Sequence, residues 1–230
     1  TVVTKTLKNK EKGAKISKTR LYTNLLSSQP LAFNLFAELS LDYDLATIFL
    51  NRQFENRIKK VTNIIFEHSD GRGDYEYTFD HSAFDVFIEY ETQIGQNGFI
   101  GIEVKYSESL KDDPATYKER YAEITNDSKL FKSESIHLLK KKPLEQIWRD
   151  HLLSIATLKD YDEGFFVFLF PSKNKECQDA VDIYVQQLKT DNEELNNFYP
   201  RHLETFVDTL SQVCKADWTV ELSKRYLGLS

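Results

Sequence analysis

Residues 83–108 read AFDVFIEYETQIGQNGFIGIEVKYSE, which is the pattern of two β-strands joined by a tight loop. The first strand, residues 84–90, is rich in aromatic and β-branched side chains, which favour extended structure. The loop, residues 93–98, contains two glycines and an Asn-Gly pair, and both are strong turn signals. In the second strand, residues 99–106, apolar and polar side chains alternate until the end. The stretch therefore predicts a β-hairpin.

Three charged side chains converge at one end of this hairpin. Glu103 and Lys105 are two residues apart on the second strand, so they point to the same face, roughly 6.5–7 Å apart along the strand. Pairing of the strands brings Asp85, near the start of the first, close to the end of the second. Two carboxylates can hold Mg²⁺ together with water and a substrate phosphate, and a neighbouring lysine can orient an attacking water. The pattern favours metal-dependent phosphodiester hydrolysis.

Asp85 and the Glu103-Val104-Lys105 triplet resemble the signature of the PD-(D/E)XK nuclease superfamily, whose members share the restriction-endonuclease-like fold. Phe84 stands where the signature has its proline. The resemblance implies that Asp85 and Glu103 bind Mg²⁺, or Mn²⁺ as a substitute, with help from the Val104 carbonyl, and that Lys105 positions the water nucleophile. We expect Lys105→Ala to abolish cleavage and spare the fold, because a lysine at a strand end carries little core packing.

The elements around the hairpin follow the order of that superfamily's core. Apolar periodicity predicts helix within residues 21–54, a strand at 57–68, a helix after Pro143 and a buried strand at 165–170. The resemblance implies an α/β fold with an αβββαβ core, in which a mixed central sheet is flanked by helices. Two further amphipathic helices are expected to cover a face of the sheet, at residues 179–188 and 203–213.

The chain of 230 residues is long enough for one sizeable core with extensions. We expect a basic N-terminal arm at 1–20, the nuclease core at 21–175, and a helical C-terminal extension at 176–230 packed on the same domain. The arm carries seven lysines and arginines against one acid, Glu11. It is either a segment that lies along a phosphate backbone or a solvated lysine-rich terminus.

Further site residues follow from the resemblance. Superfamily members often supply an extra metal-binding acid from a helix before the sheet, and Glu38 is the best match. They also place a polar residue of the helix after the E-x-K strand beside the active site, which suggests Gln146, with Arg149 as a phosphate contact. Arg72, in a glycine-rich turn, and Lys140, in a lysine triplet, are the other candidates for nucleic-acid contact. Glu38 is alternatively an exposed helix carboxylate, the loop of Arg72 is alternatively a simple turn, and the Lys140 triplet is alternatively a solvated loop.

Composition narrows the setting of this activity. The net charge of −6 does not by itself indicate a nucleic-acid binder, although local fields and bound metals can reverse the sign at a site. The cysteines, Cys177 and Cys214, form no metal-binding motif, and no apolar run approaches the length of a membrane span. We therefore expect a cytoplasmic protein.

Several blocks, among them Ser27-Ser28-Gln29-Pro30 and residues 144–151, resemble a bacterial family described as restriction endonucleases. This implies a metal-dependent endonuclease of restriction type that acts on DNA, with RNA as the other possible substrate and a homodimer as a possible assembly. One alternative is a catalytically inactive restriction-like fold that binds nucleic acid or protein. Another is a structural protein in which Asp85 and Glu103 lie far apart on the surface.

Overall fold

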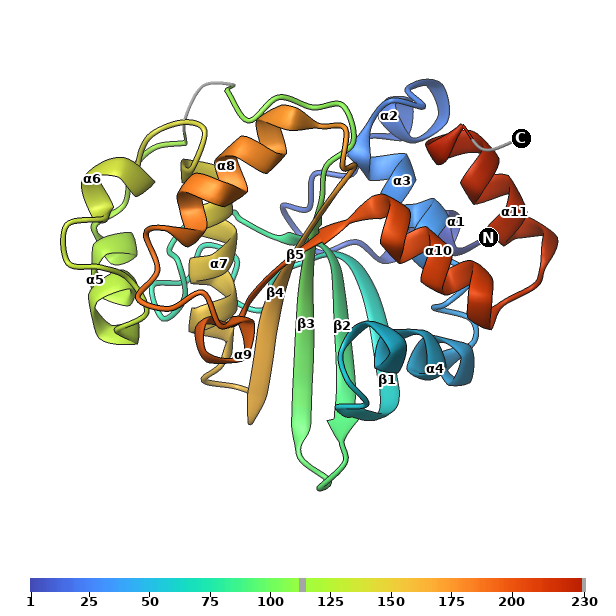
Figure 1. Ribbon diagram of the computed structural model, residues 1–230, viewed down its shortest axis with the longest axis horizontal. Coiled ribbons are helices and arrows are strands. Elements are labelled where there is room, and N and C mark those ends of the chain that lie inside the picture. The colour runs from blue at the N-terminus through green and yellow to red at the C-terminus, as the bar shows by residue number, and fades with distance from the viewer. Residues whose placement is uncertain (112–114, 229–230) are drawn as a thin grey trace.

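Within residues 1–111 and 115–228, which this computed structural model describes, five strands form a single sheet in the order β1-β2-β3-β4-β5 (Figure 1). The strands are β1 (Ile58–His68), β2 (Phe84–Thr92), β3 (Asn97–Val104), β4 (Glu163–Phe170) and β5 (Phe198–His202). The pairs β1–β2 and β2–β3 are antiparallel, whereas the pairs β3–β4 and β4–β5 are parallel. This mixed sheet and its order confirm the predicted fold class, and the β2–β3 hairpin is the one read from the sequence.

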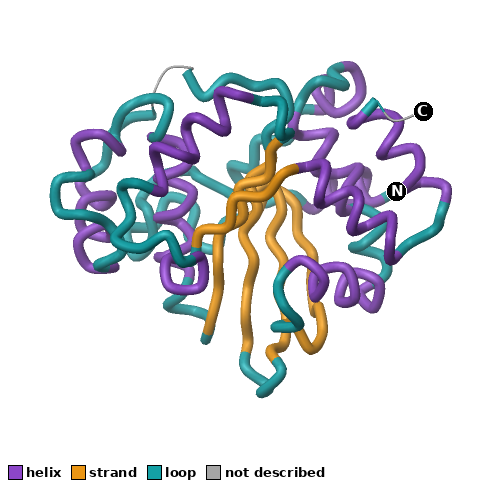
Figure 2. Tube along the Cα trace, in the orientation of Figure 1, coloured by secondary structure: helices purple, strands orange, loops and turns teal. Residues whose placement is uncertain are grey.

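Helices cover both faces of the sheet, as Figure 2 shows. One layer contains α1 (Val2–Asn9), α2 (Lys18–Thr23), α3 (Ser28–Phe36), α4 (Tyr43–Gln53), α10 (Leu203–Val213), α11 (Asp217–Leu222) and a π-helical turn, η1 (Ser223–Leu227). The other contains α5 (Glu119–Ser128), α6 (Ile136–Leu139), α7 (Glu145–Thr157), α8 (Lys175–Val185) and α9 (Glu193–Asn196). The amphipathic helices expected after the core correspond to α8 and α10.

The alternation along β3 divides the core into two layers. Ile100, Ile102 and Val104 are fully buried in the layer with α3, α4 and α10, whereas Phe99 packs into the layer with α7 and α8. Glu103 and Lys105 share the parity of Phe99, so they project toward the α7 side at the end of the strand. The central strand thus delivers two charged side chains into an otherwise apolar layer.

Gly101 explains how Phe84 replaces the proline of the signature. A Cβ atom on Gly101 would lie 2.4 Å from Cε1 of Phe84, which is too close for any real contact. The absence of a side chain on β3 therefore provides the space for the Phe84 ring, which is buried beside Asp85. The Phe84 ring thus fixes the start of β2 by packing. A proline at this position would fix it through its restricted φ angle.

Two parts of the chain differ from expectation. The edge strand β5 was not predicted, because it is only five residues long and contains Pro200, which edge strands tolerate. The basic N-terminal segment is also no solvated arm. Val2, Val3 and Leu7 of α1 pack against the core, and Ile16 is buried within it. The segment is therefore held beside the end of the sheet where the charged residues lie.

Candidate active site

A cleft of about 270 Å³ opens at the end of the sheet opposite the loop of the β2–β3 hairpin. Four of the predicted site residues line it, namely Asp85, Glu103, Lys105 and Gln146. They come from the start of β2, the end of β3 and the first turn of α7. The structure therefore brings together residues that are up to 61 positions apart in the sequence, from Asp85 to Gln146. It rules out the alternative in which Asp85 and Glu103 are distant surface residues.

Asp85 caps the end of the β2–β3 ladder. Backbone pairing of these strands ends at Val86 and Ile102, and the Oδ2 atom of Asp85 accepts the next available N–H, that of Val104, at 2.9 Å. In a strand the N–H and C=O of one residue point toward the same neighbour. The carbonyl oxygen of Val104 therefore lies on the Asp85 side of β3, as its predicted role requires.

Glu103 is held by two donors. The Nζ atom of Lys105 lies 2.9 Å from its Oε1 atom, and Nε2 of Gln146 donates a hydrogen bond of 2.7 Å to the same oxygen. Glu103 and Lys105 are each only 7% exposed, so this end of β3 is not a solvated strand face. Both donors bind the Oε1 atom of Glu103, so the Oε2 atom is left for a further partner.

The electrostatics of the cleft favour a bound cation. Burial and the charge of Glu103 raise the pKa of Asp85 well above its ordinary value, despite the hydrogen bond from Val104. Burial would lower the pKa of Lys105, but the ion pair with Glu103 outweighs it and raises that pKa. A divalent cation would relieve the repulsion between the two carboxylates, and carboxylate and carbonyl oxygens are the ligands that Mg²⁺ and Mn²⁺ prefer.

The donor set is a partial one. Among residues 1–111 and 115–228, no group of three or more His, Cys, Asp or Glu side chains is arranged to hold a metal ion. Mg²⁺ usually keeps several waters and binds through one or two protein carboxylates plus substrate phosphate. Asp85, Glu103 and the Val104 carbonyl therefore fit such a cation, with water and phosphate completing its coordination.

Glu67 is a lining residue that the sequence analysis missed. It lies one residue before the end of β1 with φ at 54°, in the left-handed region that side chains other than glycine rarely adopt. Its Oε1 atom accepts the Lys15 N–H at 3.2 Å. Burial, together with the charge of Glu103, raises its pKa. The antiparallel pairing of β1 with β2 could have pointed to Glu67. In this register His68 lies opposite Phe84, so Glu67 lies near Asp85.

The structure does not bring Glu38 to the cleft. The helix α3 points its first turn, with Ser28 and Gln29, toward the site and ends at Phe36. Glu38 lies in the turn beyond that end and is exposed to solvent. At a rise of 1.5 Å per residue along the helix axis, it is roughly 13 Å from Gln29. The helix therefore contributes an amide to the cleft, and the extra acid comes from β1.

Neither predicted arginine is placed to contact nucleic acid. The Arg72 side chain is only 7% exposed, and it binds the Glu67 carbonyl, the His81 carbonyl and Glu11. Arg149 is held by three polar side chains, Asp80, Ser82 and Glu145. Both guanidinium groups are engaged inside the protein, because acids and carbonyls from distant segments fold around them. Lys140 is exposed, but it does not line the cleft.

Besides Lys105, the described cations that line the cleft are Lys15, Arg20 and Lys142, of which Lys142 pairs with Glu145 at 2.9 Å. Lys15 and Arg20 come from the N-terminal segment, which Gln29 fixes by accepting the Ser17 N–H and donating to the Lys15 carbonyl. Arg20 pairs with Glu108 at 3.2 Å and is still 46% exposed at its side chain. An acidic floor is thus bordered by basic side chains from the segment predicted to be an arm.

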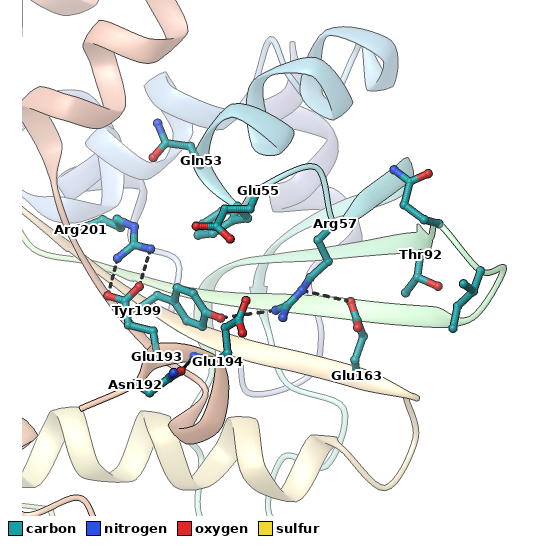
Figure 3. A pocket seen from close by; sticks show the side chains of 13 residues that line it. Gln53, Glu55, Arg57, Thr92, Glu163, Asn192, Glu193, Glu194, Tyr199 and Arg201 are labelled. Atoms are coloured by element: carbon teal, nitrogen blue, oxygen red, sulfur yellow. Dashed lines mark hydrogen bonds and ion pairs between the residues drawn. The ribbon is translucent and has the colours of Figure 1, made fainter. Parts of the chain in front are cut away.

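A second cavity, of about 760 Å³, lies at the hairpin end of the sheet (Figure 3). Its two arginines already have carboxylate partners, since Arg57 pairs with Glu163 at 3.9 Å and Arg201 with Glu193 at 2.7 Å. None of the predicted catalytic residues lines this cavity. Despite its greater volume, it is therefore not the candidate active site.

Comparison with known proteins gives one match. A family model described as the PD-(D/E)XK nuclease superfamily covers residues 1–228, which includes the N-terminal segment and the C-terminal helices as well as the core. No curated protein and no solved structure matches the chain. In the part of the chain that the structure describes, no helix has the length and apolar character needed to cross a membrane.

Proposed function

The chain belongs to the PD-(D/E)XK nuclease superfamily, and from this we propose that it is a Mg²⁺-dependent endonuclease of restriction type that hydrolyses phosphodiester bonds in DNA. The convergence of Asp85, Glu103 and Lys105 in one cleft carries the proposal. The environment of each residue suits its proposed role. The carboxylates of Asp85 and Glu103 repel one another, which favours a cation between them, and Lys105 keeps its charge despite burial.

Asp85, Glu103 and the carbonyl of Val104 are the proposed ligands of Mg²⁺, with Mn²⁺ as a substitute. A cation bound there supplies Lewis acidity toward a phosphate oxygen and toward water. Gln146 holds the Glu103 carboxylate in a fixed orientation through its 2.7 Å hydrogen bond. A ligand held in advance loses less freedom on binding, so Gln146 is proposed to act through Glu103.

Lys105 is proposed to hold the attacking water and to offset negative charge on the phosphate. Its ammonium group is buried and keeps its proton, because the pair with Glu103 outweighs the effect of burial. A charged donor that is fixed and buried stabilises developing negative charge more strongly than it would in bulk water. A lysine that stays charged suits this role better than that of a general base.

The substrate backbone is proposed to cross the mouth of the cleft over Lys15 and Arg20. Lys142 is not included, because Glu145 holds its Nζ atom at 2.9 Å. Contacts of this kind to phosphates position a nucleic acid without reading its sequence. They also offset locally the net charge of −6, which would otherwise repel a polyanion. DNA is the proposed substrate, with RNA as the other class to test, and a homodimer would allow both strands of a duplex to be cut.

The proposal is tested by titrating Mg²⁺ and Mn²⁺ into cleavage assays with supercoiled plasmid, linear duplex and RNA. Wild type is compared with Glu103→Ala and with Glu91→Ala, a matched control whose carboxylate pairs with Lys59 on the surface. Metal-dependent nicking of plasmid by wild type and by the control, lost in Glu103→Ala, supports the endonuclease. Equal cleavage by all three proteins refutes the proposed site.

A second candidate function is a binding module without turnover. It is favoured by the incomplete set of metal-binding side chains among the described residues and by Phe84 in place of the proline. This candidate predicts that wild type binds DNA in a gel-shift assay and that neither Mg²⁺ nor Mn²⁺ produces cleavage. The two functions therefore separate in the same set of reactions.

A further inference from the structure

Two leucines beside the cleft are left in solvent. Leu25 and Leu26 follow the short helix α2 and are 57% and 61% exposed, and Tyr22 within that helix is 65% exposed. Single exposed apolar side chains are ordinary on protein surfaces, whereas three within five residues of one segment require an explanation. The segment is therefore a candidate contact surface.

The local sequence explains why the leucines are exposed. Asn24 ends α2, and residues 24–27 form a β-turn in which the Ser27 N–H donates to the Asn24 carbonyl at 3.2 Å. The Asn24 side chain accepts the Leu26 N–H at 3.1 Å, a bond that asparagine commonly makes in turns. The turn places Leu25 and Leu26 at its two central positions, from which they project into solvent.

Two side chains hold this turn against the wall of the cleft. Oγ of Ser107 donates to the Leu26 carbonyl at 2.7 Å. The guanidinium group of Arg20 donates to Oγ of Ser27 at 2.8 Å. Arg20 and Ser28, on either side of the turn, both line the cleft, and Figure 1 shows α2 and α3 at that end of the sheet. The leucines are thus fixed at the mouth of the cleft before any ligand binds.

The charge of the surrounding segment indicates what covers the leucines. Between Glu11 and Glu38 the chain contains no acidic residue. It carries four exposed cations there, Lys12, Lys15, Lys18 and Arg20. Positive side chains beside apolar ones match a nucleic acid, whose phosphates are negative and whose bases have apolar faces. Because each base is joined to the backbone, a strand with a phosphate in the cleft brings its bases to the turn.

We propose that Leu25 and Leu26 form an apolar wedge that enters the base stack of the nucleic acid held in the cleft. This role rests on the proposed function, which brings nucleic acid to the cleft. Apolar side chains that enter a base step unstack it and kink the duplex. Unstacking costs least where the pairing is already disturbed. The preferred substrate is therefore a duplex with a weakened step, such as a mismatched base pair.

The test compares two short synthetic DNA duplexes that differ by one central mismatch, each with 2-aminopurine beside the central step. Binding is measured by fluorescence anisotropy of an end label, with Ca²⁺ in place of Mg²⁺ to prevent cleavage. Unstacking is measured by the fluorescence of 2-aminopurine, which rises when its neighbours leave the stack. Wild type is expected to bind the mismatched duplex about ten-fold more tightly than the paired one and to raise this fluorescence.

The variant combines Leu25→Ser with Leu26→Ser. Serine suits a turn, and neither leucine belongs to the described core, so the melting temperature is expected to be unchanged. The variant should lose the preference for the mismatched duplex and the rise in fluorescence. Its binding should keep the salt dependence of wild type, because the phosphate contacts remain. If the serine variant melts earlier than wild type, Leu25→Ala with Leu26→Ala replaces it.

Ile94→Ser is the matched control. Ile94 is 81% exposed and also lies in a turn, the loop of the β2–β3 hairpin, at the end of the sheet opposite the cleft. Its replacement removes a similar amount of exposed apolar surface from a place that the nucleic acid does not reach. The control is therefore expected to prefer the mismatched duplex as strongly as wild type does.

The outcomes separate the wedge from the proposed function. An equal preference in wild type and the serine variant, or no preference in wild type, would overturn the wedge. A wild-type dimer that becomes monomeric in the serine variant, by sedimentation velocity, would overturn it too, because a second copy of the chain would then cover the leucines. Metal-dependent cleavage by wild type without the preference removes the wedge alone, whereas the preference without cleavage supports the wedge and removes the nuclease.

Discussion

The ammonium nitrogen of Lys105 lies 2.9 Å from Oε1 of Glu103, and the two side chains are only 8% and 9% exposed. This buried pair changes the expectation drawn from the sequence, in which a strand-end lysine carries little packing. Lys105 is as much a part of the interior as of the cleft. Its removal leaves a buried carboxylate without its counter-charge, and that loss has a cost in stability.

We therefore predict that Lys105→Ala abolishes cleavage and also lowers the free energy of unfolding by about 3 kcal/mol in the absence of metal. Mn²⁺ should restore much of this loss, because the cation replaces the missing positive charge beside Glu103. Urea denaturation with and without Mn²⁺ measures both effects. A variant that cleaves at the wild-type rate would remove Lys105 from the mechanism.

Asp85→Asn should have the opposite effect on the stability of the metal-free protein. Burial and the charge of Glu103 raise the pKa of Asp85 well above its usual 3.8. The folded protein then keeps this proton after the unfolded chain has lost it, so the free energy of unfolding falls as the pH rises through that window. Asparagine has no such titration, and it retains an oxygen to accept the Val104 N–H.

At pH 7 without metal, Asp85→Asn is therefore expected to unfold at a higher temperature than wild type. Added Mn²⁺ should stabilise wild type and leave the variant unchanged. Thermal unfolding followed by circular dichroism, with and without Mn²⁺, tests both statements. A lower melting temperature for the metal-free variant would contradict the assignment of Asp85 as a buried, repelled carboxylate.

The predicted site residues that the structure brings together in one cleft are linked by short-range geometry. Glu103 and Lys105 share a face because of strand periodicity, and Asp85 reaches them through one hairpin. Short-range geometry could not show whether Arg72 and Arg149 are free to contact nucleic acid. Whether an arginine is free depends on acids far along the chain, such as Glu11 for Arg72.

The N-terminal segment shows the same limit. Its charge pattern is that of a solvated arm, yet the apolar residues of α1 are few and only their packing against the core reveals that the segment is docked. Glu67 lay within reach of sequence reasoning, because the register of β1 against β2 places it near Asp85. Its left-handed backbone had no signal in the sequence.

Lys15 should contribute to nucleic-acid binding more than Lys140. Lys15 lines the cleft through the docked N-terminal segment, whereas Lys140 is exposed away from it, with its Nζ atom 5.9 Å from the centre of the Tyr117 ring. We expect Lys15→Ala to weaken binding of duplex DNA and to reduce the slope of log K against log salt by about 0.9, the loss of one phosphate contact. Lys140→Ala is the matched control and should leave the slope unchanged.

Fluorescence anisotropy at several salt concentrations, with Ca²⁺ in place of Mg²⁺ to prevent cleavage, measures this slope. Equal effects of the two substitutions would mean that the DNA does not pass over the N-terminal side of the cleft. A loss of binding that does not depend on salt would point to a disturbed fold and would be checked by circular dichroism.

His68, at the end of β1, fastens the N-terminal segment through Glu11 and also binds Asp70, two residues further along the chain. Its Nδ1 atom contacts Glu11, and its Nε2 atom lies 2.8 Å from Oδ1 of Asp70. Burial lowers the pKa of His68, but the hydrogen bonds to Asp70 and Glu11 outweigh it and raise the pKa from 6.5 to about 9. A raised pKa means that the folded state binds the proton more tightly than the unfolded chain does.

The stability contributed by this proton is therefore fully present below about pH 6.5 and is lost as the pH rises through about 9. We predict that wild type loses up to about 3 kcal/mol in its free energy of unfolding across this window and that His68→Gln does not. The segment that contains Lys10, Lys12 and Lys15 should also become more sensitive to trypsin at pH 9 in wild type.

His202→Gln, at an exposed histidine bonded to Gln178, is the control and should follow wild type. A wild-type stability that stays flat from pH 6.5 to 9 would show that the histidine does not carry its charge between the two acids.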